Sequence, residues 1–145
     1  MPLISRRGIW VYEVLLGNAD WGKYGPTELE AQYNNRAAVP EHVEIFERWR
    51  RDSERTRARI SNRLELPYGK DPRQRLDLFL PDVAKAPLHL FVHGGYWQSL
   101  GKSYFSLLAP AFLRRGIAFA VLGYRLCPTV SLGEIVEDVR QGCLA

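Results

Sequence analysis

Two short apolar runs, residues 88–92 and 117–122, constrain the fold of this chain most strongly. Continuous apolarity over so few residues is typical of a strand that is buried on both faces of a sheet. The segment between the runs predicts a helix over 103–115, kinked by Pro110, because its apolar residues recur at helical spacing. A strand, a helix and a strand in this order connect parallel neighbours, so we expect an α/β fold with crossover helices.

The rest of the chain divides into elements by the same changes of period. The other expected elements are strands over 64–68 and 75–80, paired through the turn between them, and helices over 27–33, 41–62 and 131–144. Thr27 and Glu30 are spaced as a capping box for the first of these helices. The helix over 41–62 is expected to pack at its start, through Val43, Phe46 and Trp49, and to be exposed later. Residues 1–24 show no clean period and are interpreted as an irregular leader, leaving 25–145 as a single partial domain.

Charge and composition exclude several classes of protein. The chain has 145 residues, of which 46% are hydrophobic and 25% charged, as in ordinary globular proteins. Its net charge of +4 comes from an arginine-rich segment, 48–63. An arginine-rich helix face in solvent is commoner than a nucleic-acid site, so we expect no nucleic-acid partner. The longest uncharged run, 86–101, is shorter than the roughly 20 apolar residues of a membrane helix, and we expect no membrane partner.

The N-terminal segment and the cysteines indicate the cellular compartment of the protein. Ser5-Arg6-Arg7 faintly resembles a twin-arginine export signal, but the apolar stretch that follows is broken by Glu13 and lacks a cleavage site. Cys127 and Cys143 lie far apart and cannot form a zinc site alone. We therefore expect reduced thiols in a cytoplasmic protein.

The segment His93-Gly94-Gly95-Tyr96-Trp97 carries the clearest chemical signal, because it directly follows a predicted buried strand. Adjacent glycines allow backbone amides to point into a cavity without interference from a Cβ atom. Such amides can stabilise an oxyanion as an acyl carbonyl becomes tetrahedral. A tight turn without any ligand is the structural alternative, and the motif alone leaves the two interpretations about even.

Other motifs are weaker. Gly101-Lys102-Ser103 resembles the end of a phosphate-binding loop, but the spacing from Gly95 is wrong and Tyr96 and Trp97 would fill the phosphate site. His89 and His93 do not have the spacing of a helical metal site, and we expect neither a metal nor a cofactor. Three acidic residues of the last helix are expected to face solvent without an aligned partner; these are Glu134, Glu137 and Asp138.

Several separated blocks resemble, in order, the kynurenine formamidase-like (arylformamidase-like) and esterase-lipase-like hydrolases of the α/β-hydrolase superfamily. The blocks are 25–49, Tyr68-Gly69, Leu76-Asp77-Leu78-Phe79, 91–97 and 124–128. The resemblance covers about 25–145 and implies the N-terminal half of an α/β-hydrolase fold, with a mostly parallel sheet and an N-terminal helical segment.

The resemblance implies a serine hydrolase that acts on aryl formamides such as N-formylkynurenine, or on carboxylic esters. Gly94, Gly95 and Tyr96 would form the oxyanion loop, with the amides of Gly95 and Tyr96 as donors. His93 would shape the loop and would not be the catalytic base. Tyr96 and Trp97 would line an aromatic pocket, although Trp97 could equally pack the loop onto the body of the protein.

The chain departs from this family in lacking the catalytic triad. The expected Gly-x-Ser-x-Gly nucleophile motif is absent, and the closest segment, which contains Ser103, lacks the second glycine. All histidines precede the position of the family's base. We therefore expect a chain truncated before the nucleophile and inactive alone. The alternative is a non-catalytic fragment, from a truncated or split protein, that acts only through a partner. The run 88–92 would then be an exposed sheet edge through which the chain could self-associate.

Overall fold

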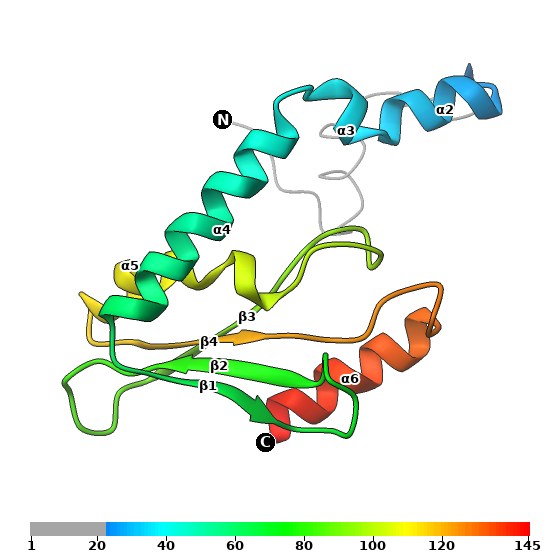
Figure 1. Cartoon of the computed structure of the whole chain (residues 1–145). Coiled ribbons are helices and arrows are strands. Elements are labelled where there is room, and N and C mark those ends of the chain that lie inside the picture. Colours follow the sequence, from blue (N-terminus) through cyan, green and yellow to red (C-terminus); the bar gives the residue numbers. More distant parts are fainter. Residues whose placement is uncertain (1–22) are drawn as a thin grey trace, which may run out of the picture. The chain divides into compact units, whose positions relative to one another are not determined.

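The computed structural model describes residues 23–145, which fall into two units divided after Pro40 (Figure 1). The first unit holds α2 (Pro26–Tyr33) and α3 (Asn35–Ala38). In the second unit the elements are α4 (His42–Arg59), β1 (Asn62–Pro67), β2 (Arg75–Phe79), β3 (Leu88–Val92), η2 (Lys102–Tyr104), η3 (Ser106–Leu108), α5 (Ala109–Leu113), β4 (Ala118–Leu122) and α6 (Leu132–Leu144). The interpretation of the leader and the export-signal hypothesis fall on 1–22, outside the described residues. None of the helices within 23–145 is long and apolar enough to cross a membrane.

The start of α2 corrects the predicted capping box. The cap is Gly25 and not Thr27, and the acidic partner is Glu28, whose carboxylate accepts a hydrogen bond from the Gly25 amide at 2.9 Å. Pro26 explains the shift, because a proline has no N–H to satisfy and its fixed φ suits the first position of a helix.

The sheet confirms the α/β class and contains all of the predicted strands. Its order is β1-β2-β4-β3, in which β1 and β2 form the predicted antiparallel pair. Within the described residues the sheet is mixed rather than mostly parallel, because β2 and β4 are antiparallel and only β3 and β4 are parallel. The segment between β3 and β4 makes the predicted crossover.

The two apolar runs differ in burial: only β4 is buried on both faces as its composition predicts, whereas β3 is the sheet edge expected of a chain that stops before the nucleophile. All of β4 is buried, as expected for a strand with neighbours on both sides and side chains covered on both faces. In contrast, β3 lies at the edge of the sheet, where Leu88 is 58% and Val92 is 42% exposed. Composition alone cannot distinguish a central strand from an apolar edge strand, because the neighbours determine burial.

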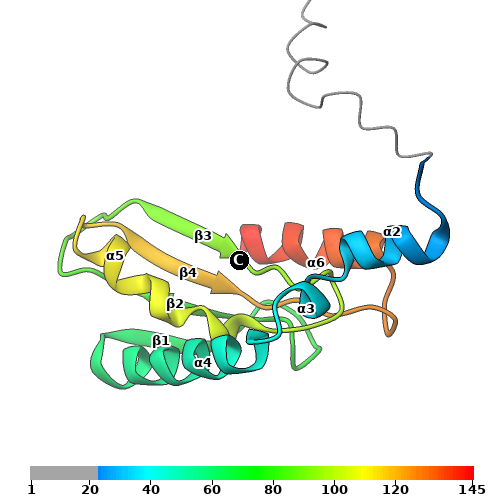
Figure 2. The same ribbon diagram turned by 90° about the horizontal axis from the view of Figure 1, so that it is seen from above.

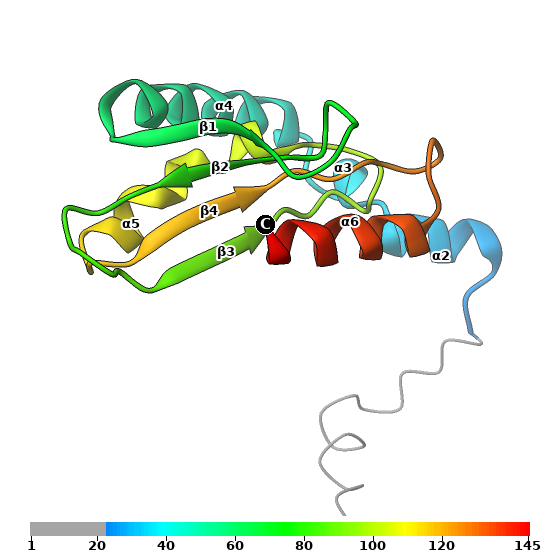
Figure 3. The same ribbon diagram turned by 90° about the horizontal axis from the view of Figure 1, so that it is seen from below.

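The core lies mainly on the sheet face covered by α4, η2, η3 and α5 (Figure 2). Phe79 of β2 and Phe119 and Val121 of β4 are fully buried there with Ala109. On the opposite face Gly142 of α6 lies against Leu122 of β4, and α6 runs on that side of the sheet (Figure 3). The sheet therefore has one well-covered face and one that α6 covers in part.

Helix α4 also packs in its second half, which corrects the expectation that this half is exposed. Trp49 contacts Phe105 near the start, with ring centroids 5.8 Å apart, whereas Val43 is 59% exposed. Further along, the buried Ser53 hydroxyl accepts a hydrogen bond from the Leu107 amide at 3.1 Å. Arg57 then donates to the Ser103 carbonyl at 2.7 Å. Polar side chains fasten the second half of α4 to the segment after β3, so this packing could not be predicted from an apolar pattern.

The single helix predicted over 103–115 is wrong. The structure has η2, η3 and the short α5 in succession. Pro110 lies in the first turn of α5. A proline is tolerated there but not inside a helix, because it lacks the N–H that would bond to the preceding turn.

Two glycines of α6 provide a matched prediction about how this helix packs. A Cβ atom on Gly142 would lie 2.3 Å from Leu122 Cδ1, whereas one on Gly133 would meet nothing closer than 3.9 Å. We expect Gly142→Ala to lower the free energy of unfolding by about 1–3 kcal/mol through overpacking. Gly133→Ala should raise it by up to about 1 kcal/mol, because alanine favours the helix. Urea unfolding of both variants measures the difference, and equal effects would contradict the contact between α6 and β4.

Candidate functional site

The loop after β3 requires glycine at position 95. Gly95 has φ +127°, and a Cβ atom there would lie 2.2 Å from the Ser99 carbonyl oxygen. The Gly95 carbonyl accepts hydrogen bonds from the amides of Gln98 and Ser99, both at 3.1 Å, and from the Ser99 hydroxyl at 2.9 Å. These contacts form a tight turn that no other residue could occupy without moving the backbone.

Tyr96 and Trp97 both adopt left-handed conformations, with φ +53° and +56°. Such conformations are costly for residues with bulky side chains and persist only where the surroundings enforce them. The Trp97 carbonyl accepts a hydrogen bond from the Cys127 amide at 2.8 Å, which fastens the loop to the segment after β4. Consecutive strained residues beside a glycine turn are the kind of feature that gathers at functional sites.

The orientation of the Gly94-Gly95 peptide follows from a hydrogen bond made by His93. His93 Nδ1 lies 2.8 Å from the Gly94 carbonyl oxygen and donates to it. In a trans peptide the N–H points opposite to the carbonyl, so the Gly95 amide is directed away from His93. Within 23–145, no acceptor is recorded for the amides of Gly94, Gly95 or Tyr96. The loop therefore presents free backbone donors, as an oxyanion site requires.

His93 lies at the start of the loop, directly after β3, and is buried, with an exposed fraction of 2%. Its ring stacks on Tyr124, at a centroid distance of 4.2 Å, and on Phe105, at 5.9 Å. Nε2 has no hydrogen-bond partner among the described residues. Burial lowers the pKa of the His93 imidazole, although its bond to Gly94 opposes this shift, so the ring is neutral at pH 7.

The lowered pKa of His93 predicts a loss of stability in mild acid. Because the ordinary pKa is 6.5, the unfolded chain binds a proton as the pH falls below that value while the folded chain resists it. We expect the midpoint temperature of thermal unfolding to decrease as the pH is lowered from 7 to 5.5. The decrease should be smaller in the His93→Gln variant. His42→Gln serves as the control. A pH dependence unchanged in His93→Gln would contradict the assignment.

Arg73 and Tyr124 support the loop, two roles that were not predicted from the sequence. Arg73 donates through Nε to the Tyr124 carbonyl at 2.9 Å and through Nη2 to the Leu100 carbonyl at 2.8 Å. The Tyr124 hydroxyl donates to the His93 carbonyl. These partners are distant in sequence, and no local pattern predicts that the three segments meet.

The predicted aromatic residues lie together on the surface of the loop. Tyr96 is 54% and Trp97 is 51% exposed, and their rings meet edge to face at a centroid distance of 6.3 Å. Trp97 therefore does not pack the loop onto the body by burying its ring. The pair is available to contact an aromatic group beside the free amides.

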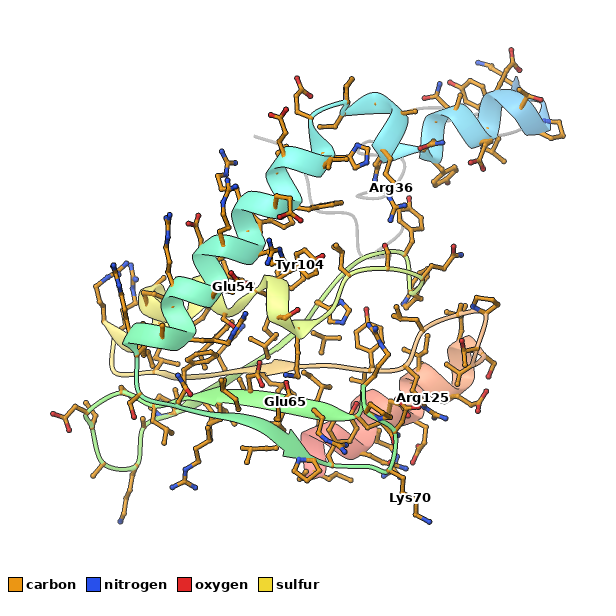
Figure 4. The ribbon with its side chains drawn as sticks, viewed as in Figure 1. Arg36, Glu54, Glu65, Lys70, Tyr104 and Arg125 are labelled. Atoms are coloured by element: carbon orange, nitrogen blue, oxygen red, sulfur yellow. The ribbon has the colours of Figure 1, made fainter. Side chains whose placement is uncertain are left out.

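The structure argues against the phosphate-binding interpretation of Lys102. Its ammonium group pairs with Asp77 Oδ1 at 2.6 Å and also with the carboxylate of Glu65, which is labelled in Figure 4. Two carboxylates hold the cation that a phosphate would need. Ser103 is exposed, and its carbonyl is the group that bonds to Arg57.

His89 packs against aromatic rings and, among the described residues, is not part of a metal site. His89 stacks on Phe112, with a centroid distance of 4.5 Å, and on Phe119. No group of three potential metal ligands occurs among residues 23–145.

Asp138 corrects the expectation that the three acids of α6 face solvent. It is 1% exposed and accepts hydrogen bonds from the Arg125 side chain at 2.7 Å, from the Arg125 amide at 3.0 Å and from Gln74 at 2.8 Å. Burial raises the pKa of the Asp138 carboxyl, but these bonds outweigh it and keep the pKa below 3.8. Glu134 and Glu137 do lie at the surface, where Glu134 completes the capping box with Ser131.

No family model matches the chain. Kynurenine formamidase of Danio rerio is 28% identical over 138 residues, which cover 88% of this chain and 46% of that protein. An isoprenylcysteine alpha-carbonyl methylesterase homologue of Oryza sativa subsp. japonica is 40% identical over 77 residues, which cover 52% of this chain and 18% of that protein.

A solved structure from Silicibacter sp. TM1040, provisionally called a thioesterase, is 39% identical with a TM-score of 0.75. The match covers 79% of this chain and 44% of that one. The chain thus spans less than half the length of these relatives. Over the part that it spans, the chain is related to the α/β-hydrolases that include kynurenine formamidases and esterases.

Proposed function

We propose that this chain supplies the oxyanion-binding loop of a serine hydrolase that cleaves aryl formamides or carboxylic esters. The observation that carries the proposal is the set of amides at Gly94, Gly95 and Tyr96 for which the described residues provide no acceptor, in a turn with three consecutive positive φ angles from Gly95 to Trp97. The relatives support the substrate class, because they are named as formamidases and esterases.

The chemistry follows from what the loop can do. As a nucleophile adds to the substrate carbonyl, negative charge develops on its oxygen. The amides of Gly95 and Tyr96 would donate hydrogen bonds to that oxygen, each stabilising the transition state by about 3 kcal/mol. Because His93 holds the Gly94 carbonyl, the Gly95 amide needs no reorientation during the reaction. Tyr96 and Trp97 would contact the aryl group of the substrate.

The sequence has no Gly-x-Ser-x-Gly motif and no histidine after His93, so we infer that it does not supply the nucleophile, the acid or the base of a triad. His93 cannot act as the base, because it is buried and its Nδ1 bonds to Gly94. We therefore propose that the chain is inactive alone and that hydrolysis requires a nucleophile-bearing partner segment. Removing all members of a triad forfeits most of the rate enhancement even where an oxyanion site remains.

Co-expression tests this proposal. The chain would be produced together with the part of the Silicibacter protein that it does not cover, and the purified complex assayed with N-formylkynurenine and p-nitrophenyl acetate. We expect turnover by the complex and none above background by either piece. A stable complex without turnover would contradict the proposal, as would turnover by this chain alone.

A second candidate function is a non-catalytic one, in which the chain acts only through association with a partner. The exposed apolar edge at β3 favours it, because such an edge is a template for another strand. The same co-expression experiment separates the two functions, since a purely structural role predicts association without hydrolysis.

We also propose a cytoplasmic location. Cys127 and Cys143 are both unpaired thiols in the structure, which suits a reducing compartment. Fractionation of cells that express a tagged chain would test this, and recovery outside the cytoplasm would contradict it. No nucleic-acid or membrane partner is part of the proposal.

A further inference from the structure

The loop that follows β3 ends at a buried ion pair. Lys102 is the first residue of η2, directly after the loop, and its side chain is only 11% exposed. Its ammonium group pairs with Asp77 Oδ1 at 2.6 Å. Asp77 lies in β2, an inner strand of the sheet, and its side chain is 2% exposed. The pair therefore joins the end of the loop to the interior of the sheet.

A local irregularity of β1 completes this cluster. Glu65 has φ +58° and lies where the register between β1 and β2 shifts. Its amide donates a hydrogen bond to Asp77 Oδ1 at 2.9 Å, and its carboxylate accepts one from Lys102. Irregularities of this kind re-aim side chains in natural sheets. Glu65 thus directs both its amide and its carboxylate at the ion pair.

Burial of the pair determines where Lys102 can lie. Taking two charges out of water costs about as much as their attraction returns, so replacing both partners together is often neutral for stability. Loss of one partner, in contrast, leaves the other charge buried and unpaired. Lys102 therefore has one favourable place, beside Asp77, and the backbone that carries it is held there.

The loop needs such an anchor because its backbone is strained. Four of its residues have positive φ, between +53° and +127°; these are Gly95, Tyr96, Trp97 and Leu100. Strained conformations persist only where the surroundings enforce them. The Trp97 carbonyl is held by the Cys127 amide and the Leu100 carbonyl by Arg73. Lys102 adds a side chain from the end of the loop itself that reaches the sheet.

We propose that Lys102 is a positioning residue of this loop, whose pairing with Asp77 fixes where the loop ends and so where the Gly95 amide points. The amides of Gln98 and Ser99 bond to the Gly95 carbonyl, so a movement at the end of the loop is passed to the turn at Gly95. In this role neither side chain touches the substrate. The consequence for catalysis rests on the proposed hydrolase function.

Three variants separate position from stability. Lys102→Met leaves the Asp77 carboxylate buried without its cation. Lys102→Met/Asp77→Asn removes both charges and keeps an oxygen for the Glu65 amide, so no buried charge is left unpaired and the fold should keep most of its stability. Glu65→Gln is the matched control, because the Glu65 side chain is 66% exposed and an exposed partner contributes little.

Hydrogen exchange of single amides in the chain alone, followed by NMR, is the first readout. The amides of Gln98, Ser99 and Cys127 report on the loop, because they bond to its carbonyl groups, and those of β4 report on the sheet. In the double variant we expect the loop amides to exchange about tenfold faster and the β4 amides to change little. Lys102→Met should accelerate both sets, and Glu65→Gln neither. Loop amides that accelerate no more than the β4 amides in the double variant would overturn the proposal, because the pair would then stabilise the fold as a whole.

Steady-state kinetics of the hydrolase reconstituted with its nucleophile-bearing segment is the second readout. We expect the double variant to lower kcat by about 10²-fold with KM little changed, because a misplaced donor weakens the transition state more than the bound substrate. Glu65→Gln should behave like the unmodified chain. A change in KM alone, or no change, would overturn the role in catalysis. An unmodified complex without turnover would contradict the proposed hydrolase function, whereas the positioning of the loop is decided separately by the exchange measurement.

Discussion

Replacing Gly95 by alanine is expected to reduce kcat of the hydrolase reconstituted with its nucleophile-bearing segment by about 10²–10³-fold, the usual cost of losing one oxyanion donor. The added Cβ would lie 2.2 Å from the Ser99 carbonyl oxygen, and φ +127° is unfavourable for alanine. The turn must therefore move, and the Gly95 amide moves with it. Steady-state kinetics with p-nitrophenyl acetate measures the loss.

Gly94→Ala is the matched control for this prediction. A Cβ atom on Gly94 would meet nothing within 4 Å, and the residue does not require a positive φ. We expect this variant to lose much less kcat, with a reconstituted complex of the same size as that of Gly95→Ala. Equal losses in the two variants would show that the turn at Gly95 does not set the position of the donors.

Replacing Asp138 by alanine is expected to lower the free energy of unfolding by about 3 kcal/mol. The carboxylate is 1% exposed and its loss leaves Arg125 and Gln74 without their acceptor. Breaking a buried ion pair costs about 3–5 kcal/mol, and we expect the lower end because the Arg125 side chain is 26% exposed. Chemical unfolding monitored by circular dichroism gives the value.

Glu137→Ala controls for the loss of an acid from the same helix. Glu137 pairs with Arg140 at the surface, and such pairs contribute little. The two variants should also differ in how their free energy of unfolding changes at acidic pH. Because the pKa of Asp138 lies below 3.8, its stabilisation is present above that pH and is lost as the pH falls through the folded pKa. The difference between the Asp138→Ala variant and the unmodified chain should then become smaller, and a difference that does not decrease in acid would contradict the assignment.

The local elements could be predicted from the sequence because their signals are local. Alternation of leucines predicted β1 and β2, and the apolar runs predicted β3 and β4. The glycine pair after an apolar strand predicted a tight turn there, and Gly95 has the positive φ that only glycine adopts readily. The predictions of the capping residues of α2 and of one continuous helix over 103–115 were wrong, because in each case a proline changed where the helix could begin.

Only the tertiary structure decided which groups support the loop and which surfaces stay open. Asp138, expected in solvent, is buried against Arg125 and Gln74, and His93 is enclosed between Phe105 and Tyr124. An apolar run is the same sequence whether its strand is central or at an edge, yet β4 is buried and β3 is not. Hydrophobic periodicity is a property of neighbouring residues along the chain, whereas burial and buried hydrogen bonds depend on segments that meet only after folding.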